Sequence, residues 1–214
     1  MTNKYDASNI ISTVDFNKLA VGNLTSLTDQ NSTTSYTWTP YPTTIPVVLD
    51  TTTNTNYLNF STTSDKLYLP FTEVIKTNNF FVEMDVQFNT KVNNTLFCFS
   101  GSTLNFYITL NNKDSGFSIR LNTTVSITFP YLFEPNTRYV IGVSKNYNTF
   151  TLYVNGKIIA TKTDVTFNNT LTTPTTYYVV GSLVPFSKFN AAVVYSFTIT
   201  SGSLLNLIIL RFNL

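Results

Sequence analysis

The chain has 214 residues, of which 11% are charged, and its 13 basic and 11 acidic residues leave a formal net charge of +2. A surface that binds along the phosphates of a nucleic acid needs clustered Lys and Arg. The small number of charged residues and the low net charge therefore argue against nucleic-acid binding. The sequence contains no histidine and only one cysteine, which excludes catalysis by an imidazole, zinc sites built from Cys and His, and an internal disulfide.

The start of the chain shows no basic end followed by an apolar core, so no secretory signal is expected. No stretch reaches the ~18 consecutive apolar residues of a membrane span. Both observations favour synthesis in the cytoplasm without a signal peptide. Thr, Asn, Ser, Phe, Tyr and Val dominate while helix formers are scarce, so local propensity favours strand almost everywhere. A chain of this length suits one large β domain over residues 1–214.

Short apolar runs separated by Thr, Asn and Ser turns mark the predicted strands. In chain order they are residues 9–16, 47–49, 57–60, 66–69, 79–88, 96–100, 104–110, 116–121, 124–129, 138–144, 149–154, 157–160, 177–181 and 191–200. Residues 23–35 have no hydrophobic period and are expected to form a long surface connection. Residues 36–46 are rich in Pro and aromatic residues, which predicts an extended segment rather than a central strand.

The clearest fold signal lies between Asn136 and Thr163. Apolar residues alternate from Phe150 to Val154 and then meet Asn155-Gly156, the dipeptide best suited to a two-residue turn with positive φ at both positions. Upstream, the run 138–144 closes at residues 145–148, whose Asn residues tolerate left-handed conformations. Three adjacent antiparallel strands are therefore predicted. Together with the number of short strands, they favour an all-β fold, a two-sheet antiparallel sandwich or jelly roll.

The last eleven residues, 204–214, form an apolar tail that is too short to span a bilayer and too apolar to remain in water. One interpretation is a buried last strand or helix. The other is a segment that docks on a neighbouring subunit. In that case the assembly interface would contain Leu205, Leu207, Ile209 and Phe212.

The strand at 139–144, its polar tip and the hairpin at 149–156 are similar to the laminin G-like and pentraxin-like branch of the concanavalin A-like lectin/glucanase superfamily. The resemblance extends over about residues 57–203. It includes residues 57–60, 67–70 and 80–88, which follow the strand order of the family, and 190–199, which resembles its closing strand. It implies a jelly roll of two large antiparallel sheets, one of them concave, with the first and last strands paired.

The resemblance implies glycan or protein binding, sometimes with calcium, and in one branch glucan hydrolysis. The hydrolytic branch carries Glu-x-Asp-x-Glu, because a nucleophile and an acid/base must flank the scissile bond about 5.5 Å apart. Here Glu83 and Asp85 match the first two acids, but the third position is Gln87. Glutamine cannot donate and recover a proton, so a non-enzymatic protein is expected. An ordinary polar strand face is the favoured explanation of the two acids.

Ligand sites implied by the resemblance rest on few residues. Calcium needs several converging oxygen ligands. The 111–115 loop offers a single carboxylate, Asp114, so it would be a weak Ca²⁺ site and is otherwise a hairpin turn. Sugars usually stack on exposed rings, for which the candidates are Trp38, Tyr41 and Tyr147, with Glu83 and Asp85 as polar partners. Packing is the alternative explanation of the rings.

Two functions remain open. The first is a non-enzymatic structural or surface subunit of a large assembly, above all a virion capsid, fibre or decoration protein that forms homo-oligomers and attaches to host glycans. Long sheets with few charged gatekeepers and an apolar tail favour this interpretation. The second is a carbohydrate-binding, lectin-like module, which the resemblance favours and the missing signal counts against. Fold alone does not decide between them.

Overall fold

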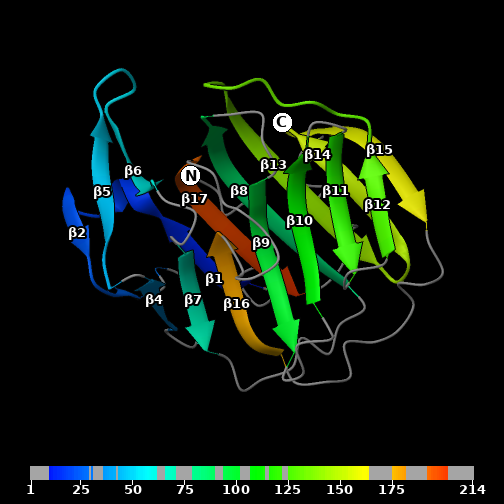
Figure 1. The fold of residues 1–214 in the computed structure, drawn as a ribbon, viewed down its shortest axis with the longest axis horizontal. Coiled ribbons are helices and arrows are strands. Elements are labelled where there is room, and N and C mark those ends of the chain that lie inside the picture. Colours follow the sequence, from blue (N-terminus) through cyan, green and yellow to red (C-terminus); the bar gives the residue numbers. More distant parts are fainter. Residues whose placement is uncertain are drawn as a thin grey trace, which may run out of the picture.

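A computed structural model of the chain describes residues 10–28, 30, 36–41, 43–61, 66–70, 79–89, 94–101, 107–113, 116–121, 125–163, 175–181 and 192–201. Two antiparallel β-sheets pack face to face, with β7, β16, β9, β10, β11 and β12 drawn in front of β17, β8, β13 and β14 in Figure 1. The prediction of an all-β, two-sheet antiparallel sandwich is confirmed. No helix in the described part of the chain is long and apolar enough to cross a membrane.

Among the described residues, one sheet has nine strands and the other has eight. The nine-stranded sheet runs in the order β15 (Lys157–Thr163), β14 (Thr149–Val154), β13 (Arg138–Asn146), β8 (Asn79–Phe88), β17 (Ala192–Ser201), β6 (Thr55–Phe60), β5 (Ile45–Asp50) and β2 (Gly22–Leu24), and β1 (Ile10–Asp15) also pairs with β17. The eight-stranded sheet runs in the order β12 (Val125–Phe129), β11 (Gly116–Leu121), β10 (Tyr107–Lys113), β9 (Asn94–Gly101), β16 (Thr175–Gly181), β7 (Lys66–Pro70), β4 (Thr37–Tyr41) and β3 (Leu27–Thr28). A 3₁₀ turn, η2 (Phe16–Lys18), follows β1.

The core lies between the two sheets, and strand β8 shows why. Its even-numbered residues from Phe80 to Phe88 are at most 2% exposed, whereas Glu83, Asp85 and Gln87 point to the outer face. Alternate residues of a strand face opposite sides of a sheet, so this sequence makes one face apolar and the other polar. The opposite sheet contributes buried residues such as Phe117 and Ile127 to the same core.

The predicted hairpins are present as β13, β14 and β15, which pair in that order. Asn155 and Gly156 have φ of 50° and 78°, as the Asn-Gly turn requires. In the preceding turn the positive φ, 52°, falls on Tyr147 rather than on an asparagine, so that detail of the prediction is wrong. The Tyr147 N–H donates to Asn79 Oδ1 at 3.0 Å, and Lys145 Nζ donates to the Tyr147 carbonyl, which stabilises the unusual conformation.

Three sequence predictions need correction. The region 23–35 contains the short strands β2 and β3, which are too brief to show a hydrophobic period. Residues 36–46 contain a strand, β4, which pairs with β3 on one side and with β7 on the other. The strand tolerates Pro40 because β3 pairs only with Thr37 and Trp38 and leaves the edge beside Pro40 open. The turn expected at 111–115 is shorter, since Lys113 already pairs with Gly116 across β10 and β11.

The first and last described strands pair, as the family resemblance implied. One edge of β17 is shared: β6 pairs with residues 192–194 and β1 pairs with residues from Ser196 onward. On the other edge, β17 pairs with β8, and the register shifts between Val194 and Ser196. This β-bulge places one extra residue, Tyr195, in β17 at the point where β1 replaces β6.

Candidate functional site

The bulge in β17 aims an aromatic side chain away from the core. Val194 and Phe197 both face the core. Two residues three positions apart in a regular strand face opposite sides of the sheet, but the extra residue of the bulge breaks this alternation. Tyr195 and Ser196 therefore both lie beside Asp85 on the outer face of the nine-stranded sheet. The Tyr195 side chain is nevertheless almost fully covered, at 4% exposure.

Arg138 of β13 covers the Tyr195 ring. Its guanidinium carbon lies 3.6 Å from the ring centroid, which is a close cation–π contact. The same guanidinium donates from Nε and Nη2 to the two oxygens of Asp85, each at 2.8 Å. This bidentate hydrogen bond raises the pKa of Arg138. Pairing and stacking together fix the orientation of the arginine on the sheet.

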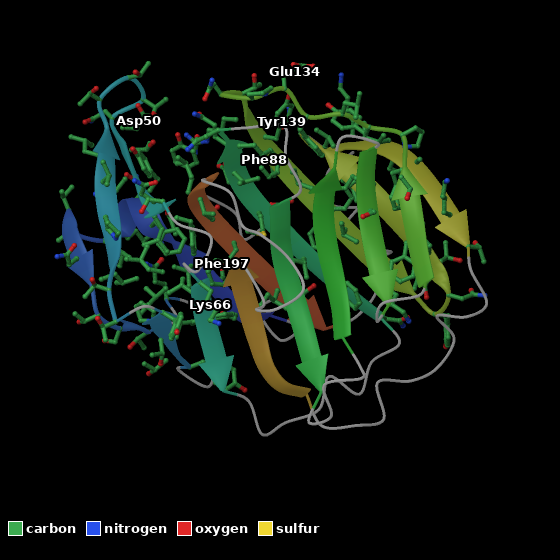
Figure 2. All side chains as sticks on the ribbon, viewed as in Figure 1. Asp50, Lys66, Phe88, Glu134, Tyr139 and Phe197 are labelled. Carbon is green, nitrogen blue, oxygen red and sulfur yellow. The ribbon has the colours of Figure 1, made fainter. Side chains whose placement is uncertain are left out.

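Tyr195 also connects the sheet to the loop between β5 and β6. Its hydroxyl donates to Asp50 Oδ2 at 3.1 Å, and Figure 2 places Asp50 at the end of β5 beside that loop. Asp50 accepts further bonds from the backbone N–H groups of Thr52 and Thr53 and from the Thr53 hydroxyl. The Thr53 hydroxyl bond is the main reason that the pKa of Asp50 is lowered. Burial, followed by the bond to Asp50, raises the pKa of Tyr195 to about 12.

Two hollows share Arg138 and Tyr195, and we call them together the Arg138 cleft. The loop hollow, of about 470 Å³, is bounded by the β5–β6 loop, Tyr57, Gln87 and Val193. The strand hollow, of about 250 Å³, is bounded by Asp15, Asn56, Asp85 and Ser196, among others. The cleft thus lies where β1 and β6 meet along β17, and its side chains come from strands that are distant in sequence.

Several polar groups of the cleft have hydrogen-bonding capacity to spare. Within the part of the chain that the structure describes, the Gln87 amide, the Ser196 hydroxyl and the Tyr57 hydroxyl have no hydrogen-bond partner. Arg138 keeps the N–H groups on Nη1 and one on Nη2 for an external acceptor. A rigid surface that combines free donors, free acceptors and an aromatic ring suits a ligand rich in hydroxyl groups.

The chain resembles solved structures in its fold, but no protein-family model and no curated protein sequence matches it. Among solved structures, the botulinum neurotoxin serotype D binding domain matches with a TM-score of 0.67 and 17% identity, over 97% of this chain and 52% of that chain. The serotype D ligand-binding domain in complex with N-acetylneuraminic acid matches with a TM-score of 0.65 and 16% identity, over 97% and 52% of the two chains.

The binding domain of botulinum neurotoxin DC in complex with rat synaptotagmin II matches with a TM-score of 0.67 and 14% identity, over 95% of this chain and 51% of that chain. This chain therefore spans about half the length of the solved structures that it resembles. At these identities the likeness shows the fold alone, a β-sandwich that the neighbouring structures use in binding domains.

The structure places the predicted sugar platforms in different environments. Trp38 is fully buried, donates from Nε1 to Ser12 Oγ at 3.1 Å and packs edge-on against Phe197 with ring centroids 4.9 Å apart. The prediction of an exposed ring at Trp38 is therefore wrong, because the indole fills the core under β17. Tyr41 and Tyr147 are exposed, at 50% and 59%.

The two exposed rings are not brought together. Tyr41 lies on β4, near one end of the eight-stranded sheet, with Lys66 Nζ 4.5 Å from its ring centroid. Tyr147 lies on the turn between β13 and β14, in the other half of the sandwich in Figure 1. Their roles in glycan binding stay predictions. Asp114 and the tail residues Leu205, Leu207, Ile209 and Phe212 lie outside the described residues.

The predicted polar strand face contributes to the cleft in part. Asp85 and Gln87 line it, whereas Glu83 lies further along the same face and is not among the residues that line either hollow. Asp85 accepts from Arg138 with both oxygens, which leaves each oxygen one further lone-pair site. Sequence reasoning missed Arg138, Tyr195 and Asp50. No sequence signal was available for Tyr195, because apolar residues alternate with it as in a regular strand, at Val193, Phe197 and Ile199, and predict an inward-facing ring.

Proposed function

We propose that this chain is a non-enzymatic attachment domain that binds a glycan in the Arg138 cleft. The observation that carries the proposal is the set of free donors and acceptors around a fixed guanidinium, together with the half-buried Tyr57 ring that lines the loop hollow. Glycans present hydroxyl groups in pairs and an apolar ring face, which such a surface can bind. The fold neighbours are binding domains, which supports a binding role, and the laminin G-like resemblance supports membership of the concanavalin A-like superfamily.

The arrangement of the acids supports a role without catalysis. A retaining glycosidase needs a nucleophile and an acid/base about 5.5 Å apart, and the acid/base must exchange a proton. Asp85 is fixed in a bidentate salt bridge to Arg138, and the matching third acid of the hydrolytic pattern is Gln87. The cleft is therefore better suited to holding a sugar than to cleaving one.

The test is a glycan array followed by titration of each hit, using the full chain and two variants. Gln87→Ala removes a cleft amide without touching the core, and we expect it to weaken binding about tenfold, the loss of one or two hydrogen bonds. Tyr147→Ala is the matched comparison, because its ring is exposed on a distant turn. Binding that survives Gln87→Ala and is lost in Tyr147→Ala would place the site at the hairpin instead. Binding to no sugar would refute the proposal.

A second role, as a surface subunit of a virion or another large assembly, is favoured by strand β15. In the described part of the chain β15 pairs with β14 alone, and Ile158 and Ile159 on it are 59% and 37% exposed. An edge strand with exposed apolar residues can pair with another chain. Light scattering should show an oligomer for the full chain. A monomer for the full chain, unchanged by removal of residues 204–214 or by Ile158→Lys, would refute assembly.

A further inference from the structure

We propose that the Arg138 cleft selects uncharged sugars and rejects acidic ones, an inference that rests on the proposed function. The charges that line the cleft carry this inference. Across both hollows the charged lining residues are one arginine, Arg138, and three aspartates, Asp15, Asp50 and Asp85. Three negative charges against one positive charge leave an excess of two negative charges. No lysine lines either hollow in the described part of the chain.

Arg138 does not offset this excess for an incoming anion. Both oxygens of Asp85 lie 2.8 Å from its Nε and Nη2, so the guanidinium charge is already matched. A ligand carboxylate that accepted from the remaining N–H groups of Arg138 would lie close to Asp85 as well. Repulsion between the ligand carboxylate and the nearby Asp85 carboxylate opposes the attraction of the ligand to Arg138.

The acceptors of the cleft favour hydroxyl groups for the same reason. Asp15 and Asp85 lie opposite Ser196 on its two neighbouring strands, β1 and β8. Strands are about 4.8 Å apart, so the two aspartates flank the serine with their Cα atoms roughly 10 Å from each other. Among the described residues, Asp15 Oδ1 accepts only from the Asn17 backbone N–H. A sugar that lies along this row can donate hydroxyl groups to both carboxylates, whereas an acidic group cannot donate.

Asp50 repels anions without binding the ligand directly. Its two oxygens already accept from Thr52, from the backbone and hydroxyl of Thr53, and from the Tyr195 hydroxyl. These bonds leave few lone pairs for a sugar, but the negative charge remains beside the loop hollow. Asp15 and Asp85 are thus expected to bind hydroxyl groups, while Asp50 contributes mainly to the rejection of acids.

Matched ligands isolate the charge. The probes are the methyl glycosides of galacturonic acid and of N-acetylneuraminic acid, each as the free acid and as the methyl ester, titrated at low ionic strength. The two members of a pair share a ring and differ in charge. We expect the ester to bind on the order of tenfold more tightly than the acid. The preference should shrink as salt is raised, because exposed charges are screened.

Two double variants locate the effect. Asp15→Asn with Asp50→Asn removes both excess charges and keeps an oxygen for each backbone bond, and it should reduce the ester preference to about twofold. Glu83→Gln with Glu134→Gln changes the net charge of the chain equally, and neither residue lines the cleft; Figure 2 shows Glu134 well apart from Asp50. This control should keep the preference.

The outcomes separate the two proposals. If sugars bind but the acid binds as tightly as its ester, or if the Glu83/Glu134 control abolishes the preference as fully as the Asp15/Asp50 variant, the selectivity inference is wrong and the glycan-binding function stands. If no sugar binds to the wild-type chain, both are wrong.

Discussion

Removal of the Tyr195 hydroxyl tests how the cleft is held together. Tyr195→Phe keeps the ring, and with it the stacking of Arg138 at 3.6 Å, but deletes the hydrogen bond to Asp50. A hydrogen bond contributes about 0.5–1.5 kcal/mol net, and an exposed acceptor can recover part of its solvation from water. We expect the variant to lose about 0.5–1 kcal/mol at pH 7. For a chain of this size, that corresponds to a decrease in Tm of about 1–4 °C.

The difference between wild type and variant should depend on pH. The folded state raises the pKa of Tyr195 from 10.0 to about 12. Because the raised pKa belongs to the folded state, the associated stability is complete below pH 10 and is lost as the pH rises toward 12. The phenylalanine variant lacks this titration. The stability advantage of the wild type should therefore shrink between pH 10 and pH 12.

Urea denaturation followed by Trp38 fluorescence, at pH 7 and at several values above pH 10, measures both effects. Tyr57→Phe is the matched control, because the Tyr57 ring packs edge-on against Tyr195, at 5.7 Å between centroids, while its hydroxyl has no partner among the described residues. That control should change stability little. An unaltered stability of Tyr195→Phe at pH 7, or a difference from wild type that does not vary with pH, would refute the reasoning.

Three further predictions concern the framework of the site, and each is measured by the free energy of unfolding. Asn155→Ala should cost about 1–2 kcal/mol, because Asn155 has φ of 50° and its Oδ1 accepts from a backbone N–H of β13 at 2.9 Å. A loss of less than a few tenths of a kcal/mol would contradict this prediction. Gly142→Ala should cost about 1–3 kcal/mol, since an added Cβ would lie 2.9 Å from the Phe81 ring, and Phe81→Leu should partly rescue it. Trp38→Phe should cost about 2–4 kcal/mol through the cavity and the lost bond to Ser12; full stability with weaker sugar binding would instead restore Trp38 as a ligand platform.

The strands were largely predictable from local patterns. The bounds of β8 and β11 match the predicted ranges, because one face of β8 is apolar without interruption and β11 begins at the turn residue Gly116. The Asn155-Gly156 turn was equally clear, since few dipeptides adopt positive φ at both positions without strain. Strand β4 was not predicted, because Pro40 argues against a central strand. That rule applies only where both neighbouring strands are long enough to pair beside the proline, and β3 is too short to reach Pro40.

The cleft was predictable only in part. Asp85 and Gln87 were identified because β8 carries its polar residues on a single face, a pattern that is visible in the sequence. Arg138 required the register of β13 against β8, which places it diagonally across from Asp85. Tyr195 required the bulge in β17, and Asp50 required the pairing of β5 with β6 beside it.

The sequence by itself determined the all-β class, the polar face of β8 and the hairpins from β13 to β15, because these depend on side-chain alternation and on turn residues close together in the chain. Only the tertiary structure decided that Trp38 lies in the core and that Arg138, Tyr195 and Asp50 meet on the outer face. The physical reason is that contacts between distant strands depend on strand order, register and one inserted residue, and a shift of a single position turns every side chain of a strand to the opposite face.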